Sequence, residues 1–422
     1  MMTISDPLRA FAEKLPSDWQ LLPFEAMLTE PVRNGVYKTK EFHGSGVRVV
    51  NMGELFGFDF ISEQEMKRVE LTSEEVRKSG LNDGDLLFAR RSLVLEGAGK
   101  CSLVVNPPEA ITFESSIIRA RPNRRITEPR FLFYLFTSPL GRAIVASIAT
   151  RTAVSGIRGS DLMRVGLPLP PLRVQRRIAS ILSAYDELIE NNQRRIRILE
   201  NMARSLYREW FVHFRYPGHE SVPLVESSFG QIPQGWEVRN LKDIAKVTYG
   251  CALKSQSFNA DGNGLPVVRI RDIPTGASET YSAEECDVKY HINNGHILVG
   301  MDGDFHMCIW SNGLALQNQR VARFESQGEI GNYHLFLALE RPIQEFNMAI
   351  VGTTVAHLGD MHIKTISIVW PPSALREKAT KILEPLSGQV IALKCQTSNL
   401  RRTRDLLLQR LLAGDISLFE RQ

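Results

Sequence analysis

The sequence predicts an α+β protein with an internal two-fold repeat, in which two α/β domains are separated by two long antiparallel helices that pair as a coiled coil. Three observations carry this prediction. Residues 172–214 contain no Gly or Pro and have a helical seam of apolar residues. A second stretch with the same opening dipeptide follows much later in the chain, and the strand-like segments before each stretch recur in the same order.

The first long stretch has the spacing of a heptad seam. From Tyr185 onward, apolar residues follow at alternating steps of four and three, which is typical of a coiled coil, with one polar member. A helix of this length cannot bury its seam alone, so it requires a partner helix. The expected seam residues are Tyr185, Ile189, Asn192, Ile196, Leu199 and Leu206.

The partner is the second stretch, where Pro371-Pro372 repeat Pro170-Pro171. Pro385 and Gly388 predict a kink or a loosened turn near its start, and Thr397 and Arg404 make its seam weaker. The alternative is that both stretches are core helices of one globular bundle. The expected seam residues are Leu386, Val390, Leu393, Leu400 and Leu407.

The repeat extends beyond the helices. Each half opens with a Pro and a Trp, continues with a glycine followed by a short basic stretch, and then has a turn leading into a buried strand, at 82–90 and 293–301. Each half closes with a strand that runs into the Pro-Pro pair. The expected boundaries are a first domain at 1–170, a first helix at 171–215, a linker at 216–235, a second domain at 236–370, a second helix at 371–415 and a tail at 416–422.

Composition excludes several classes of protein. The five cysteines form no CxxC pair, which favours a reducing compartment and no zinc site. The chain begins without an apolar signal region and has no apolar run of about 18 residues, so we expect neither secretion nor a membrane span, but a cytoplasmic protein. The formal net charge of +4 is too small to indicate nucleic-acid binding alone, although basic residues outnumber acidic ones on both long stretches.

A body with two similar domains matches a ligand with two spaced half-sites, and duplex DNA is such a ligand. Base reading favours Arg for guanine and Asn or Gln for adenine, whereas phosphate contacts favour Lys, Arg, Ser and Thr. Gly35 and Gly250 would let the backbone approach DNA closely or turn sharply. For each segment the alternative is an ordinary exposed loop. The candidate DNA-binding residues are Tyr37, Lys38, Thr39, Lys40, His43, Arg90, Arg91, Arg151, Ser155 and Arg158 in the first half, and Lys254, Ser255, Gln256, Arg269, Arg271, Asp302, His306, Thr353 and His357 in the second.

An enzyme would need a site, and the candidate motifs are incomplete. Asn106-Pro107-Pro108-Glu109 is similar to the Asn-Pro-Pro-aromatic motif of adenine methyltransferases, but Glu109 cannot stack on a flipped-out base. Gly97-Ala98-Gly99-Lys100 is similar to the end of a P-loop, but Cys101 replaces the hydroxyl that would hold Mg²⁺. We therefore expect no catalysis by this chain. A protein scaffold without DNA specificity is the remaining alternative.

Four segments resemble the specificity subunit of type I restriction–modification systems. They are NGVYKTKEFHGSGVRVVNM (34–52), YGCALKSQSFNADGNGLPVVRIRDI (249–273), GHILVGMDGDF (295–305) and LPLPPLRVQRRIASILSAYDELIENNQRRIRILENMARSLYREWFV (167–212). The resemblance implies that 1–170 and 236–370 are target-recognition domains, each reading one half of a bipartite, asymmetric site in double-stranded DNA. It implies that the two long helices set the spacing and dock two methyltransferase subunits. It also implies restriction and translocase subunits as partners, with S-adenosylmethionine, ATP and Mg²⁺ bound by partner subunits and no cofactor in this chain.

Overall fold

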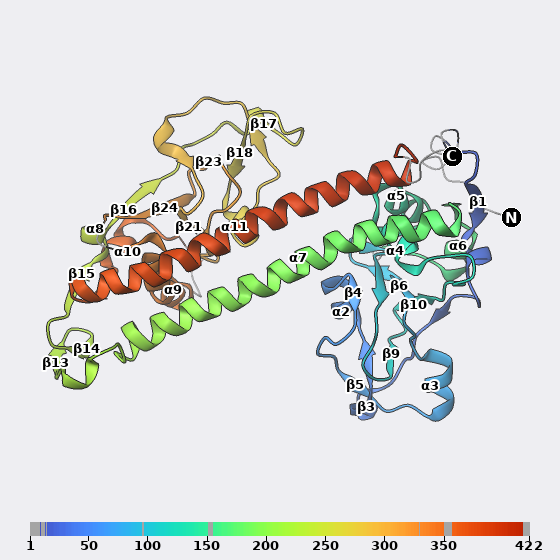
Figure 1. Cartoon of the computed structure of the whole chain (residues 1–422), viewed down its shortest axis with the longest axis horizontal. Helices are drawn as coiled ribbons and strands as arrows, with labels where there is room; N and C mark the ends of the chain where they lie inside the picture. Colours follow the sequence, from blue (N-terminus) through green and yellow to red (C-terminus); the bar gives the residue numbers. More distant parts are fainter. Residues whose placement is uncertain are drawn as a thin grey trace. The chain divides into compact units, whose positions relative to one another are not determined.

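The computed structural model describes residues 9, 13, 15–94, 97–150, 155–328, 330–349 and 357–416. The chain divides into two compact units, of which the first combines Met1–Glu187 with Arg401–Gln422 and the second is Leu188–Leu400 (Figure 1). Each unit joins an α/β domain to a stretch of each of the two long helices, α7 (Leu172–Tyr207) and α11 (Ser373–Leu412). The chain therefore has the mixed α+β architecture that the sequence predicts.

The first unit is built on a five-stranded sheet in the order β2-β10-β6-β8-β4 and a three-stranded sheet in the order β5-β3-β9. The central strands β6, β8 and β10 are buried along their whole length, and the polar residues among them, Ser102 and Arg119, are buried as well. The strands are β1 (Gln20–Pro23), β2 (Arg33–Asn34), β3 (His43–Val50), β4 (Phe60–Ile61), β5 (Arg68–Val69), β6 (Leu86–Ala89), β7 (Arg91–Ser92), β8 (Cys101–Val104), β9 (Ile111–Phe113), β10 (Ile117–Ala120), β11 (Ser155–Gly156) and β12 (Gly166–Leu169). The shorter helices are α2 (Met52–Gly57), α3 (Ser73–Ser79), α4 (Pro129–Thr137), α5 (Pro139–Ser147) and α6 (Gly159–Arg164).

The second unit has a four-stranded sheet in the order β16-β24-β21-β22 and a five-stranded sheet in the order β17-β19-β18-β23-β20. A hairpin of β13 (Leu224–Ser227) and β14 (Gly230–Pro233) precedes them. The remaining strands are β15 (Glu237–Asn240), β16 (Ala245–Tyr249), β17 (Phe258–Asn259), β18 (Leu265–Val268), β19 (Tyr281–Ser282), β20 (His291–Ile292), β21 (Ile297–Gly300), β22 (Met307–Ile309), β23 (Ala315–Gln317), β24 (Val321–Ser326) and β25 (Ser367–Trp370). The shorter helices are α8 (Leu241–Ile244), α9 (Asn332–Ala349) and α10 (Asp360–Thr365).

The two units repeat one frame of strand pairings. The parallel pair β3–β9 of the first unit corresponds to the parallel pair β18–β23 of the second. The antiparallel pair β6–β10 corresponds to β21–β24, and β6–β8 corresponds to β21–β22. In both units the first strand of the domain pairs with the strand that leads into the long helix, as β1–β12 and β15–β25. The predicted internal repeat is confirmed.

The two long helices run antiparallel within each unit. In the first unit, Asp186 of α7 forms an ion pair with Arg404 near the end of α11, at 2.6 Å. In the second unit, the amide of Asn192 donates to Gln396 at 3.2 Å. Later on α7, the Glu200 carboxylate meets Lys394 at 2.8 Å. As the residue number rises on α7 it falls on α11, so the predicted antiparallel pairing is confirmed.

The predicted seam lies along this pairing. Ile189, Asn192, Val390 and Leu393 are buried, and the other predicted seam residues are half-buried: Tyr185, Ile196, Leu199, Leu206, Leu386, Leu400 and Leu407. The helix α11 continues unbroken through Pro385 and Gly388, where the sequence predicts a kink or a loosened turn.

The helices contribute to the core of each unit. In the first unit, Ile178 and Leu182 of α7 and Leu411 of α11 pack with the domain's buried residues. In the second unit, Phe211 is buried, and Tyr207 and Trp210 pack against the same core. These three aromatic residues therefore belong to the core of the second unit. Across the ranges that the structure describes, no helix is both long and apolar enough to cross a membrane.

Candidate nucleic-acid interface

Gly35 and Gly250 occupy matched places in the two units, and each packs against the chain's own backbone. A Cβ atom on Gly35 would lie 2.6 Å from the carbonyl carbon of Phe113, and one on Gly250 would lie 2.7 Å from the carbonyl oxygen of Gln317. The residue after each glycine donates its backbone N–H to the same carbonyl, at 2.9 Å and 3.1 Å. The glycines thus allow close approach within the protein, and they fix the segments that follow to the end of an internal strand.

In the first unit, the segment after Gly35 contains both exposed and tied side chains. Tyr37 is 81% exposed, and Lys40 is exposed as well. Lys38 instead forms an ion pair with Glu75 at 2.8 Å. Hydrogen bonding from Lys38 and from the Thr72 backbone lowers the pKa of Glu75 to about 2.

The remaining side chains of this segment bond locally. The Thr39 hydroxyl donates to Glu41 at 2.5 Å, and Nε2 of His43 lies 3.2 Å from the carbonyl oxygen of Lys38. Both residues are exposed. The exposed positions in this segment are therefore Tyr37, Thr39, Lys40 and His43, with Lys38 held against the domain.

In the second unit, the matched segment after Gly250 combines a buried Leu253 with exposed polar residues. The backbone N–H of Lys254 donates to Glu284 at 2.9 Å, and Ser255 and Gln256 follow in a 3-10 turn. The side chains of Lys254, Ser255 and Gln256 are all on the surface. The two units therefore present different residues from one backbone arrangement.

Arg269 is bonded within its own loop, whereas Arg271 is exposed. Arg269 lies 3.3 Å from Asp272, donates to the Thr280 hydroxyl, and lies over the ring of Phe258 at 5.8 Å. Its guanidinium therefore stabilises the loop around it. Arg271 is exposed.

A second set of candidates meets where the chain leaves β6 in the first unit. Arg91 of β7 pairs with Gly156 of β11, and the backbone N–H of Ile157 donates to the carbonyl of Arg90 at 3.0 Å. The structure thus joins two segments that are far apart in the sequence. Arg91 and Arg158 are exposed, whereas Arg90 is half-buried and Ser155 is buried.

The same crossing occurs in the second unit, where the chain leaves β21. Asp302 forms a β-bridge with His357, and its carboxylate accepts from Nδ1 of His357 at 2.6 Å. The guanidinium of Arg320 also reaches this carboxylate, at 3.4 Å. Sequence reasoning missed Arg320, which follows a run of amide side chains just before β24. His306 lies nearby in sequence and is exposed. Two predicted residues, Arg151 and Thr353, lie outside the described residues.

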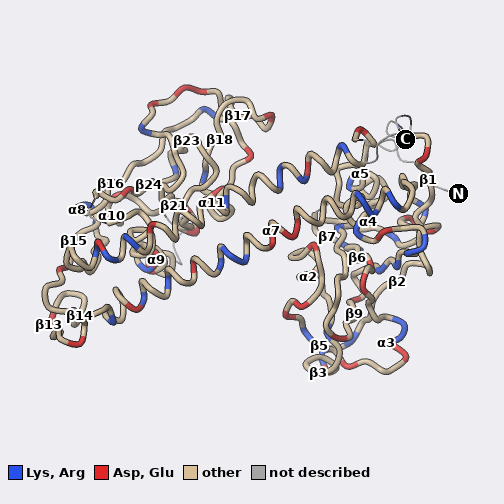
Figure 2. The backbone as a smooth tube through the Cα atoms, viewed as in Figure 1, with Lys and Arg blue, Asp and Glu red and all other residues tan. Residues whose placement is uncertain are grey.

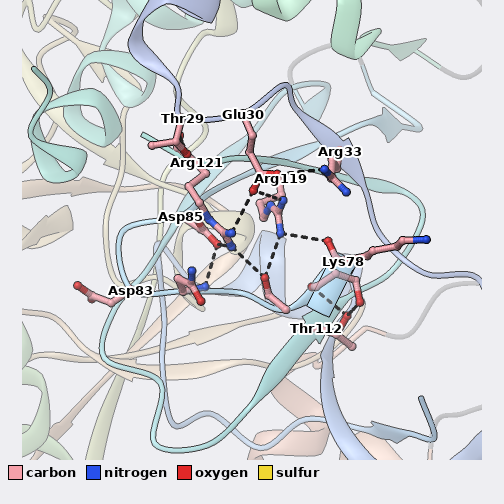
Figure 3. A network of polar contacts seen from close by, with 12 residues as sticks. Thr29, Glu30, Arg33, Lys78, Asp83, Asp85, Thr112, Arg119 and Arg121 are labelled. Carbon is pink, nitrogen blue, oxygen red and sulfur yellow. Dashed lines mark hydrogen bonds and ion pairs between the residues drawn. The ribbon is translucent and has the colours of Figure 1, made fainter. Parts of the chain in front are cut away.

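Other basic residues of the first unit are internal links (Figure 3). Arg119 is 1% exposed, with Glu30 at 2.8 Å. Arg121 pairs with Asp85 at 2.8 Å, and both guanidinium groups donate to the backbone carbonyl of Gly80 at 3.0 Å. These arginines tie β10 to its neighbouring loops. Their guanidinium groups are engaged by carboxylates and a backbone carbonyl of their own unit.

Both signs of charge occur along α7 and α11, where short groups of Lys and Arg are separated by fewer Asp and Glu residues (Figure 2). Within the described ranges, no group of three or more His, Cys, Asp or Glu residues is placed to hold a metal ion. The exposed loops of each unit offer hydrogen-bonding groups and single charges, and such groups suit recognition of a polar ligand.

Comparison with known proteins gives a consistent result. Residues 28–201 and 233–400 match the family described as "Type I restriction modification DNA specificity domain". The chain is 23% identical to the Type I restriction enzyme MjaIX specificity subunit of Methanocaldococcus jannaschii, over 96% of this chain and 95% of the relative. It is 30% identical to the Type I restriction enzyme EcoBI specificity subunit of Escherichia coli over 44% of this chain and 40% of the relative. The fold is similar to the crystal structure of a type I restriction–modification S subunit from M. genitalium, with a TM-score of 0.59 and 18% identity over 94% of this chain and 98% of that one.

Proposed function

The chain belongs to the type I restriction–modification DNA specificity family, and from this premise we propose that each of its two units reads one half of a bipartite, asymmetric sequence in double-stranded DNA. The chain is the DNA specificity subunit of a type I complex, and it is not itself a catalyst. Each copy of the family domain, at 28–201 and 233–400, contains one target-recognition domain and part of a long helix.

One observation carries the proposal of independent half-sites: the two units repeat one frame but expose different side chains from it. At the crossing after the central strand, the first unit presents Arg91 and the second presents Asp302 with His357. Different hydrogen-bond donors and acceptors select different bases, so two such units suit a site whose halves differ. The same holds for the segments that follow the matched glycines.

We assign DNA contacts to the exposed candidates and a supporting role to the tied ones. Lys38 and Arg269 are engaged by carboxylates of their own units, so they support the loops that carry their neighbours. The proposed contact residues are Tyr37, Thr39, Lys40, His43, Arg91 and Arg158 in the first unit, and Lys254, Ser255, Gln256, Arg271, His306 and His357 in the second.

The long helices are assigned the spacing of the two half-sites. Each of them continues from one unit into the other, since α7 and α11 span the division between the units. The Asn192–Gln396 hydrogen bond lies in the seam, and a polar pair there favours one register of the two helices over slipped ones. A fixed register supports a fixed gap between the half-sites.

The proposed partners follow from the family and from exposed apolar side chains on α7. On α7, the side chains of Leu188, Ile198 and Met202 are 52%, 52% and 54% exposed, which leaves apolar surface for docking two methyltransferase subunits. Restriction and translocase subunits complete the complex. S-adenosylmethionine, ATP and Mg²⁺ belong to these partners, and this chain binds DNA.

The test is a genome-wide map of methylated adenine in cells with and without the gene for this chain. Deletion should remove methylation from one bipartite motif. Complementation with a chain whose residues 1–150 come from a related subunit should then change one half of that motif and leave the other half as it was. If deletion leaves every methylated motif in place, the chain does not specify DNA modification. If the exchange alters both halves, the units do not read independently.

A further inference from the structure

We propose that Arg320 reads a guanine in the half-site bound by the second unit, and that Asp302 is the positioning residue that holds it. This inference rests on the proposed function and adds a residue and a base to it. The sequence motifs do not point to Arg320, which becomes visible only when three distant segments meet.

Backbone hydrogen bonds fix the place of Arg320. The N–H of Met301 donates to the carbonyl of Arg320 at 3.0 Å, and the N–H of Leu358 donates to the carbonyl of Met301 at 2.7 Å. The segment after β21, the turn before β24 and the segment before α10 therefore converge at one point. The side chain of Arg320 is carried by a backbone bonded to the central sheet, as base reading requires.

The first unit has the same pair of backbone bonds with other side chains. The N–H of Arg90 donates to the carbonyl of Ser116 at 2.9 Å, and the N–H of Ile157 donates to the carbonyl of Arg90 at 3.0 Å. Ser116 thus stands where the second unit has Arg320. The first unit therefore has a short hydroxyl where the second unit has a long guanidinium. Such a difference gives two units with the same backbone arrangement different base preferences.

The side-chain geometry leaves the Nη groups of Arg320, which would contact a base, on the exposed side of the guanidinium. Asp302 is 26% exposed, and it engages Nε of Arg320 at 3.4 Å and Nδ1 of His357 at 2.6 Å. Arg320 and His357 are more exposed, at 54% and 43%. Within the described part of the chain, no hydrogen bond and no second acidic residue engages the guanidinium of Arg320, whose shortest contact with Asp302 is at Nε. A planar guanidinium whose Nε side faces a carboxylate can present its two Nη groups as a fork, which matches the O6 and N7 acceptors of guanine in the major groove.

Charge also favours this role. Asp302 bears a negative charge that alone would repel DNA phosphates, but its pairing with Arg320 offsets that charge. An ion pair this exposed contributes little to folding stability, and its carboxylate faces the Nε side of the guanidinium. By contrast, Arg269 is 21% exposed and engages both an acid and a hydroxyl of its own loop, so it has no free fork.

The experiment uses the assembled methyltransferase complex that contains the full chain. Three variants are compared with the wild type: Arg320→Ala removes the fork, Arg320→Lys keeps the charge and the ion pair without the fork, and Asp302→Asn weakens the positioning. Arg341→Ala is the matched control, because Arg341 is 80% exposed and is likewise paired with a carboxylate, Glu345, at 2.7 Å. The readouts are the motif of methylated adenines in cells and binding to duplexes with single base changes.

Arg320→Ala and Arg320→Lys should both make one guanine position degenerate, within the half that the exchange of residues 1–150 leaves unchanged. Binding of the cognate duplex should weaken by about 10- to 100-fold, with binding of a duplex changed at that guanine unaltered. Asp302→Asn should give a smaller loss at the same position, and Arg341→Ala should change neither readout.

Two results would overturn the inference. One is an unchanged motif with wild-type affinity in both Arg320 variants. The other is a uniform loss across all duplexes, which indicates a phosphate contact or a structural role. If the wild-type complex shows no sequence preference at all, the proposed function fails. If the wild type is specific and the Arg320 variants keep that specificity, the failure is confined to Arg320.

Discussion

Replacing Gly250 by alanine should destabilise the second unit severely and leave the first unit intact. The added Cβ would clash with the carbonyl oxygen of Asn318 and lie 2.7 Å from that of Gln317. Both carbonyls are backbone groups at the end of a buried strand, so neither can turn away as a flexible side chain could. Carbon and oxygen atoms that are not bonded approach to roughly 3.3 Å, so the two segments must separate.

The magnitude follows from the bonds that such a separation breaks. Gly250 N–H donates to Val321 at 3.2 Å, and Cys251 N–H donates to Gln317 at 3.1 Å. Each such bond contributes about 1 kcal/mol, and overpacking a well-filled site costs about 1–3 kcal/mol. Together the expected loss is about 3–5 kcal/mol, which is a large part of the about 5–15 kcal/mol that stabilises a typical domain.

The assay is hydrogen exchange of backbone amides, because it reports the two units separately. Gly250→Ala should speed exchange in β23 and β24, and Gly35→Ala should do the same in β9 and β10. Gly53→Ala is the control: its Cβ would meet no atom within 4 Å. Since Gly53 lies inside α2, alanine there should be neutral or stabilise by up to about 1 kcal/mol. Wild-type exchange in the second unit of Gly250→Ala would refute this account of the glycine.

Two further predictions concern the helices and the pH dependence of stability. Deleting one heptad of α7 around Asn192, together with the heptad of α11 around Gln396, removes about 10 Å of helix. It should shorten the unread gap of the methylated motif or abolish modification, whereas modification of the unchanged motif would rule out the spacing role. Burial, with a smaller effect of Arg376, lowers the pKa of His334 to about 3 from 6.5. As the pH falls, the unfolded chain protonates the His334 imidazole at a higher pH than the folded chain does. The free energy of unfolding should therefore be highest above pH 6.5 and should decrease below it, by about 2 kcal/mol at pH 5. Urea unfolding at pH 5 and 7.5 should show that His334→Phe removes this loss.

The candidate site shows where sequence reasoning is strong and where it stops. The glycines at 35 and 250 are visible in the sequence as a repeated pattern, but their role is not, because the carbonyl groups they meet lie far along the chain. Arg404 looks like a defect in the second seam. In the structure it pairs with Asp186, whose carboxylate also accepts the hydroxyl of Tyr134 at 2.5 Å.

By itself, the sequence determined the features that follow from local spacing. The heptad steps from Tyr185 onward define a long helix, and the return of Pro170-Pro171 as Pro371-Pro372 reveals the repeat, since both can be read within short stretches of chain. Only the tertiary structure decided which basic residues are paired within their own unit and which remain exposed. Lys38 forms an ion pair with Glu75, Arg119 with Glu30, and Arg320 with Asp302 through its Nε side. These ion pairs join residues that are distant along the chain. Because electrostatic attraction acts through space, no local sequence pattern predicts them.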